Sequence, residues 1–233
     1  MHMKNLGGIS QINIGKSNVV AFFDFDGTLY DGVVAADFLK FAIRHRALKL
    51  NQMARLPKFL YYYALDKLKL ADRYDVNVKI YKRIKGWDSK VVNNASKKFF
   101  VKVKKKFFTE IVDIVQRHKR DGHKVVIVTS ALKEVVVPIT AWLSADDIMA
   151  SEVNTNNGIY TGTINVLPVG KMRIKVISKY CTMNNIDMAK SFAYSDHYSD
   201  IPMLKGVGNP VAVNPERRLR RYAKKHGWKI IDV

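Results

Sequence analysis

Short apolar runs alternate along the chain with longer stretches in which apolar residues recur at helical spacing. Residues 19–24 (VVAFFD) are continuously apolar up to the aspartate and rich in β-branched and aromatic side chains, as expected of a parallel strand covered on both faces. We expect similar strands at 124–130, 191–196 and 211–214. Strands that alternate with helices predict a doubly wound, Rossmann-like α/β fold with a parallel sheet. The helices are expected at 109–120, 131–143, 169–181, 199–205 and 215–226, the last beginning after Asn214 with Pro215 in its first turn.

Two segments interrupt this alternation. Residues 151–165 alternate polar and apolar side chains around Asn157-Gly158, which predicts a β-hairpin. In the longer segment, 33–108, apolar residues recur at helical spacing and no buried strand is evident. We interpret this segment as an all-helical cap over the carboxyl end of the sheet. The predicted organisation is a flexible extension at 1–17, an α/β core domain formed by 18–32 and 109–233, and a cap domain at 33–108.

The composition allows a large apolar core. Of the 233 residues, 48% are apolar and 11% aromatic, so global disorder is excluded. Cys181 is the single cysteine, which rules out an intramolecular disulfide and favours a reducing compartment. No apolar run reaches the roughly 20 residues needed to span a bilayer, and the first residues lack a signal pattern. We therefore expect a cytoplasmic protein.

The charge is strongly positive and concentrated in one region. Lysine and arginine number 40 against 20 acidic residues, and 23 of the basic residues with only 7 acidic ones lie within 40–121. A positive cap would attract anionic substrates in a salt-dependent way. Two alternatives stay open: a nucleic-acid surface, and a helix at 54–70 that lies on anionic lipid. The run 96–108 is expected to be a solvated helix with Phe99, Val103 and Phe107 on its apolar face.

Candidate chemistry gathers where the predicted strands end. Asp24, Ser130 and Asp196 each stand at or next to the end of a strand, and ligands of such sheets bind beyond the carboxyl ends of the strands. Asp24 and Asp26 run directly into Gly27. Two unpaired carboxylates are costly to bury, so they indicate an active site. An ordinary turn is the alternative reading.

These residues together resemble the haloacid dehalogenase superfamily. The segment 24–28 (DFDGT) is similar to its first motif, and Ser130 stands where its second motif has a hydroxyl. Lys171, at the start of a helix, is similar to the third motif, and Asp196 with Asp200 to the fourth. The order of the motifs, the helical insertion and the hairpin resemble the phosphoserine-phosphatase-like branch, subfamily IB.

The resemblance implies a phosphomonoester hydrolase that works through an aspartyl-phosphate intermediate. Asp24 is then the nucleophile, and Asp26 protonates the leaving group and later deprotonates the attacking water. Ser130 and Gly27 are expected to bind the phosphate. Lys171 is expected to balance charge on the nucleophile and on the phosphate. His197, inside the fourth motif, is expected to be an exposed loop residue.

The resemblance also implies Mg²⁺ as cofactor, because clustered carboxylates and a phosphate need a cation between them. The expected ligands are the carboxylates of Asp24 and Asp196 and the backbone carbonyl of Asp26. Asp200 is expected to orient the site, or Lys171, without binding the metal itself.

The sequence indicates the type of reaction more directly than it indicates the substrate. In phosphoserine phosphatases a glutamate shortly after the first motif binds the substrate amine, whereas the matching residue here is Val33. Asp31 or Asp37 are alternative partners for an amine. We therefore expect a small or lipid-headgroup phosphomonoester, with phosphoserine not assumed. The alternatives are a phosphotransferase or mutase with the same site, and a nucleic-acid- or membrane-binding protein that uses the basic cap.

Overall fold

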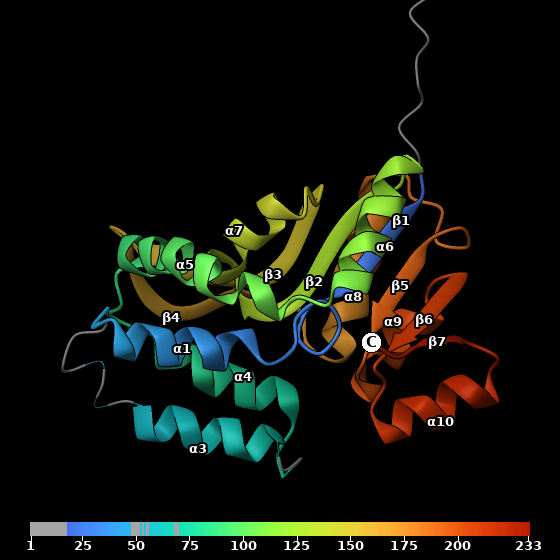
Figure 1. Ribbon diagram of the computed structural model, residues 1–233. Helices are drawn as coiled ribbons and strands as arrows, with labels where there is room; N and C mark the ends of the chain where they lie inside the picture. The colour runs from blue at the N-terminus through green and yellow to red at the C-terminus, as the bar shows by residue number, and fades with distance from the viewer. Residues whose placement is uncertain (1–17, 48–51, 53, 55, 68–69) are drawn as a thin grey trace, which may run out of the picture.

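A single twisted sheet forms the centre of the molecule. The computed structural model describes residues 18–47, 52, 54, 56–67 and 70–233, and within these ranges the sheet has the order β4-β3-β2-β1-β5-β6-β7 (Figure 1). Neighbouring strands run parallel except β3 and β4. The predicted doubly wound α/β fold is confirmed. The strands are β1 (Val20–Asp24), β2 (Lys124–Leu132), β3 (Asp147–Asn156), β4 (Ile159–Val166), β5 (Phe192–Ser195), β6 (Asn209–Val213) and β7 (Lys229–Ile231).

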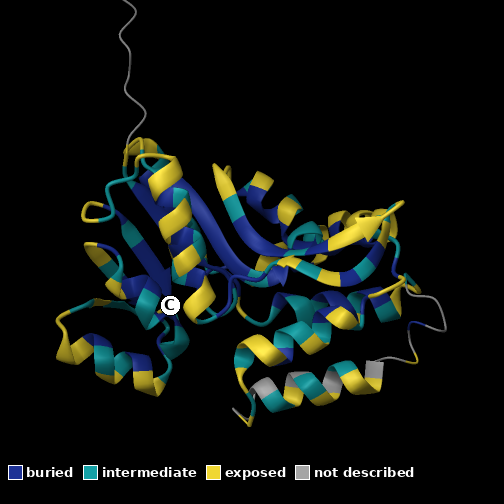
Figure 2. Cartoon of the chain, turned by 180° about the vertical axis from the view of Figure 1, so that it is seen from behind, coloured by how far each residue is buried: buried dark blue, intermediate teal, exposed yellow. Residues whose placement is uncertain are grey.

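Helices cover both faces of the sheet, because successive side chains of a buried strand point to opposite faces. Phe23 packs in a core cluster with α6 (Thr109–Arg120) and α7 (Lys133–Trp142). Phe22 packs in a second cluster with the helices of the other face. Figure 2 shows the central strands buried and the outer sides of the helices exposed. The helices of the second face are α8 (Lys171–Met183), α9 (Ile201–Lys205), which follows the short turn η2 (Tyr198–Asp200), and α10 (Arg217–Lys225).

The described residues between β1 and α6 form helices and turns and contribute no strand to the sheet. Figure 1 shows these helices as a layer beside the sheet, next to β3 and β4. The carboxylates of Asp72 and Asp88 cap two of them, each accepting backbone N–H groups of the first turn. The division of the chain into a core domain and a separate cap domain stays a prediction. The elements are α1 (Val34–Arg44), α3 (Leu56–Lys67), α4 (Arg73–Lys82), α5 (Ser89–Val103) and the turn η1 (Lys104–Lys106).

The predicted hairpin is present as β3 and β4. Asn157 and Gly158 both have positive φ, 48° and 79°, as a tight hairpin turn requires. The hairpin also binds the helical layer: Ser89 donates its N–H to the Gly158 carbonyl, and Tyr160 donates its N–H to the Trp87 carbonyl. The loop between α4 and α5 is therefore hydrogen-bonded to a strand that is continuous with the core sheet.

Several boundaries differ from the prediction. The last helix begins at Arg217 rather than at 215, because Glu216 is still extended and donates its N–H to the Asp196 carbonyl. The helix within 96–108 ends at Val103, yet Phe107 beyond it is buried against Phe25. The strand β7 and the first residues of β3 had no distinct pattern in the sequence.

Two further expectations concern a membrane and the start of the chain. None of the described helices is long and apolar enough to cross a membrane. The expected extension at 1–17 lies outside the described residues, as do 55 and 68–69 of the expected lipid-surface helix.

Candidate active site

The turn after β1 places two carboxylates at the end of the buried strand. Asp24 is 6% exposed, and the carbonyl oxygen of Phe25 accepts the backbone N–H groups of residues 28–30, which turns the chain sharply. Gly27 has φ +78°, and a Cβ at this position would lie 2.3 Å from Oδ2 of Asp196. Only glycine fits here, so the turn brings the first strand and the loop after β5 into direct contact.

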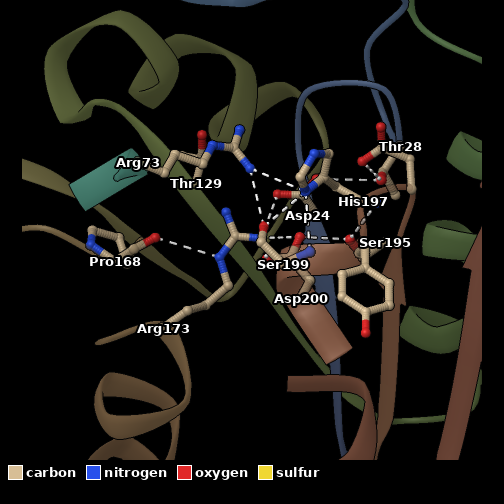
Figure 3. A network of polar contacts seen from close by, with 12 residues as sticks. Asp24, Thr28, Arg73, Thr129, Pro168, Arg173, Ser195, His197, Ser199 and Asp200 are labelled. Atoms are coloured by element: carbon tan, nitrogen blue, oxygen red, sulfur yellow. Dashed lines mark hydrogen bonds and ion pairs between the residues drawn. The ribbon is translucent and has the colours of Figure 1, made fainter. Parts of the chain in front are cut away.

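A buried arginine lies against the Asp24 carboxylate (Figure 3). Nη1 of Arg173 is 2.8 Å from Oδ1 of Asp24 and 2.6 Å from Oδ2 of Asp200. Nε of the same guanidinium donates to the Pro168 carbonyl at 3.4 Å. Both carboxylates and the guanidinium are almost fully buried, so the two negative charges share this one contacting positive charge.

Lys171 does not occupy the position predicted for it. Its side chain is exposed in the first turn of α8, and the cation that contacts Asp24 is Arg173. The two residues are two positions apart, which is roughly 200° around a helix. They therefore project to nearly opposite sides, and only the side chain of Arg173 faces the end of the sheet.

The two carboxylates of the first motif have different surroundings. Burial raises the pKa of Asp24, and the Arg173 guanidinium opposes this shift. Burial raises the pKa of Asp26 to about 7, although its carboxylate accepts the N–H of Val34 at 2.8 Å. Asp26 therefore titrates near neutral pH, as a group that donates and accepts protons requires.

The loop after β5 completes the carboxylate cluster. Oδ2 of Asp200 accepts the Ser195 hydroxyl at 2.6 Å. The Thr28 hydroxyl lies 3.4 Å from Asp24 and 3.5 Å from Asp196, so it stands between these two carboxylates. Burial, together with the negative charges of Asp24 and Asp200, raises the pKa of Asp196 to about 8.

A cavity of about 470 Å³ lies beside the cluster, although Asp24, Asp196 and Asp200 are not among its described lining residues. Asp26 and Ser130 both line it, so the structure brings these two predicted residues to one space. The backbone carbonyl of Ser130 is held from two sides, since it accepts the Tyr81 hydroxyl and the Ser151 hydroxyl. Ser130 is therefore fixed in position beside Asp26.

Two further residues of the cavity wall connect the helical layer to the sheet. Arg73, the first residue of α4, reaches the loop after β5, where Nη1 donates to the Ser199 hydroxyl at 3.1 Å. The same nitrogen lies 3.4 Å from Nδ1 of His197, and Figure 3 shows its side chain directed at this cluster. Its positive charge lowers the pKa of Asp24 and of Asp26, against the larger effect of burial.

The sequence profile of the haloacid dehalogenase-like hydrolases matches residues 21–205, well over half of the chain. The chain belongs to this family. The predicted family is thereby confirmed, and the chain is an enzyme of a hydrolase family, as expected.

Relatives of this hydrolase include proteins that carry phosphatase names. A probable phosphatase of Mycobacterium tuberculosis is 28% identical over 93% of this chain and 76% of its own length. Phosphoserine phosphatase SerB1 of the same organism is 27% identical over 91% of this chain and 70% of its own length. The inhibition of morphological differentiation protein of Streptomyces azureus is 37% identical over 54% of this chain, which matches 46% of that protein. A phosphatase of this family is the class that we predicted.

Solved structures share the fold of this hydrolase. A protein of unknown function from Bordetella pertussis Tohama I superposes with a TM-score of 0.82 at 22% identity, over 93% of this chain and 99% of that one. A substrate-bound phosphoserine phosphatase superposes with a TM-score of 0.66 at 17% identity, over 91% and 92% of the two chains. At this level of identity the likeness concerns the fold alone.

The donors at the cluster suit a hard cation such as Mg²⁺. Asp24 and Asp196 are carboxylates that share the Thr28 hydroxyl between them, and their mutual repulsion contributes to the raised pKa of Asp196. A cation between them would relieve that repulsion. No three Asp, Glu, His or Cys side chains of the described ranges converge on one metal position. Asp200 instead faces Arg173 and Ser195, and its role outside the metal ligands stays a prediction.

The site also contains residues that sequence reasoning missed. Arg173 gave no signal, because a basic chain offers many lysines and arginines near Gly170. Arg73 lies far from every motif in the sequence. His197 was expected to be exposed, but it is half-buried in the cavity wall. Its place directly after Asp196 was the one available signal.

Proposed function

We propose that the chain is a Mg²⁺-dependent phosphomonoester hydrolase that forms an aspartyl-phosphate on Asp24 and acts on a small or lipid-headgroup phosphate. The observation that carries this proposal is the contrast between its two neighbouring carboxylates. Asp24 contacts a buried guanidinium, whereas Asp26 lines the cavity and has no cation within ion-pair distance among the described residues. One carboxylate is thus fixed against a cation, and the other faces the space where a leaving group would lie.

In the first step Asp24 Oδ attacks the phosphorus atom and the bond from phosphorus to the leaving oxygen breaks. Asp26 gives its proton to that oxygen, so the leaving group departs as an alcohol. In the second step Asp26 takes a proton from water, and the water oxygen attacks the phosphorus. Inorganic phosphate leaves, and the Asp24 carboxylate is regenerated.

The remaining residues bind and orient. Arg173 holds the nucleophile and offsets negative charge beside it, while Asp200 fixes the guanidinium from the other side. Ser130, which lines the cavity, would hydrogen-bond phosphate oxygens. The N–H of Gly27 donates to the Tyr30 carbonyl, so Gly27 would contribute through the shape of the turn instead. Asp24, Asp196 and the carbonyl of Asp26 would hold Mg²⁺, which supplies positive charge to the phosphate when bound.

The test is hydrolysis of p-nitrophenyl phosphate, measured as release of inorganic phosphate with and without Mg²⁺. Asp24→Asn should lower kcat by about a thousandfold or more, since the nucleophile is lost. Asp113→Asn, an exposed aspartate of α6, is the matched control and should leave kcat unchanged. Robust turnover by Asp24→Asn, or full activity after chelation of divalent ions, would overturn the proposal.

A further inference from the structure

The cavity beside Asp26 has two chemically different ends. The charged residues gather at one end, where Asp26, Arg73 and His197 lie together with the loop after β5. The rest of the wall comes from the helical layer, from the end of β2 and from α7. Most of these residues are apolar and buried, with Asn77 and Ser130 as polar exceptions; the apolar ones include Phe38, Leu39, Phe59, Ile84, Trp87 and Val135.

The carboxylates of the cavity wall lie at its charged end. Asp26 and Glu216 line the cavity, and Glu216 accepts the N–H of Tyr198 at 3.1 Å and lies 3.6 Å from Nε2 of His197. Asp37 accepts the Tyr30 hydroxyl at 2.8 Å and pairs with Lys106 at 2.7 Å, and it is not part of the described cavity wall. An amine placed among the apolar residues at the other end would therefore lose its hydration without a carboxylate beside it.

The wall also contains a buried donor without a protein acceptor. Trp87 is 7% exposed, and no atom of the described residues accepts a hydrogen bond from its indole Nε1. A buried N–H of this kind is unfavourable until an acceptor occupies the space beside it. Trp87 itself lines the cavity, so its N–H is a candidate donor to an acceptor that binds there.

We propose that the substrates are phosphomonoesters whose alcohol carries an apolar body, an alkyl chain or an aryl ring, and that this body occupies the cavity. The proposal rests on the phosphatase function proposed above. The phosphate lies at the charged end beside Asp26, and the apolar body extends along Phe38, Ile84 and Trp87. An ester or hydroxyl oxygen within that body accepts from the Trp87 indole.

A series of n-alkyl phosphates from ethyl to octyl tests the alkyl form, and phenyl and 2-naphthyl phosphate test the aryl form. We expect kcat/KM to rise about three- to fourfold for each added methylene until the cavity is full. Phosphoserine should be hydrolysed less well than butyl phosphate. If kcat/KM is flat or falls along both series while ethyl phosphate is hydrolysed, the inference is wrong and the phosphatase proposal stands.

Binding without turnover separates the two proposals further. Alkylphosphonates keep a carbon–phosphorus bond and are not hydrolysed, so calorimetry reports occupancy of the cavity alone. Octylphosphonate should bind at least about a hundredfold more tightly than methylphosphonate. Equal affinities would overturn the inference, whereas loss of all hydrolysis with this affinity difference intact would overturn only the phosphatase proposal.

Val33 supplies a variant pair. It lines the cavity at the start of α1, where a carboxylate is also compatible with the helix N-terminus. Val33→Glu should lower kcat/KM for octyl phosphate by about tenfold or more, because the chain would meet a desolvated charge. It should raise kcat/KM for phosphoserine relative to the parent. Val33→Gln introduces a side chain of the same size as glutamate but without the charge, and it should not raise kcat/KM for phosphoserine. If the two variants have equal kcat/KM for both substrates, the proposal is wrong.

Discussion

At the residue scale, the site depends on which side of a helix a cation projects from. The sequence predicts a cation shortly after Gly170, and the structure has one, but it is Arg173 rather than Lys171 that contacts Asp24. The phase of α8 against the sheet decides this, and it is set by packing of Ile177 and Cys181 in the core. A single sequence shows that basic residues follow Gly170, but it does not show how α8 is rotated against the sheet.

Replacement of Arg173 should affect both catalysis and stability. Arg173→Ala leaves Asp24 and Asp200 as buried carboxylates without their cation, which we expect to cost about 3–5 kcal/mol of unfolding free energy. Arg173→Lys keeps the charge but has one nitrogen in place of the planar guanidinium, whose Nε and Nη1 contact Pro168, Asp24 and Asp200. It should fold, and its kcat on p-nitrophenyl phosphate should fall by about ten- to a hundredfold. Lys171→Ala is the control and should change kcat little. If Lys171→Ala lowers kcat more than Arg173→Lys does, Lys171 is the charge-balancing cation, as the sequence predicted.

At the element scale, the central strands were predictable because continuous apolar runs have few alternatives in an α/β chain. The hairpin was predictable because Asn157-Gly158 fits few other turns. The strand β7 was not, since its three residues are exposed or half-buried and its pairing depends on β6. Arg73 was not predictable as part of the site, because its position depends on how α4 packs against the loop after β5.

Arg73 is the point at which α4 contacts the charged end of the cavity. Arg73→Ala should raise KM for p-nitrophenyl phosphate by about tenfold, because an anionic substrate loses a nearby guanidinium. The dependence of kcat/KM on salt should become weaker for the same reason. Lys82→Ala removes an exposed charge from the end of the same helix and should change KM far less. If Arg73→Ala and Lys82→Ala raise KM equally, the overall positive charge of the region, rather than contact between Arg73 and the substrate, determines substrate binding.

At the scale of the whole molecule, one hydrophobic cluster joins the sheet to the helical layer. Phe23 and Val125 of the sheet belong to the same cluster as Phe38 and Phe99 of the helices. The total apolar content indicated that such a core would exist, but not that it would be continuous across the predicted domain boundary. We therefore expect the described regions to unfold together, so a buried group anywhere in this cluster affects the free energy of unfolding of the whole chain.

His118 is such a group, and it makes stability depend on pH. It is 6% exposed, on α6 against Phe23, and its Nε2 lies 2.8 Å from the Tyr194 hydroxyl. Burial, with the neighbouring His123, lowers the pKa of His118 to about 4, whereas an unfolded histidine titrates near 6.5. Between these values the unfolded chain binds more protons, so the unfolding free energy should fall as pH falls, by up to about 1.4 kcal/mol per pH unit from this residue.

Urea unfolding of the parent and of His118→Gln between pH 4.5 and 7.5 measures this contribution. The carboxylates with raised pKa values, Asp24, Asp26 and Asp196, titrate alike in both proteins and cancel in the comparison. The destabilisation caused by His118→Gln should therefore be largest at pH 7.5 and should shrink steadily towards pH 4.5, because the parent loses stability that the variant never had. A difference that stays constant across this range would mean that His118 is protonated in the folded protein as readily as in the unfolded chain, and that its packing against Phe23 and Tyr194 does not require the neutral ring.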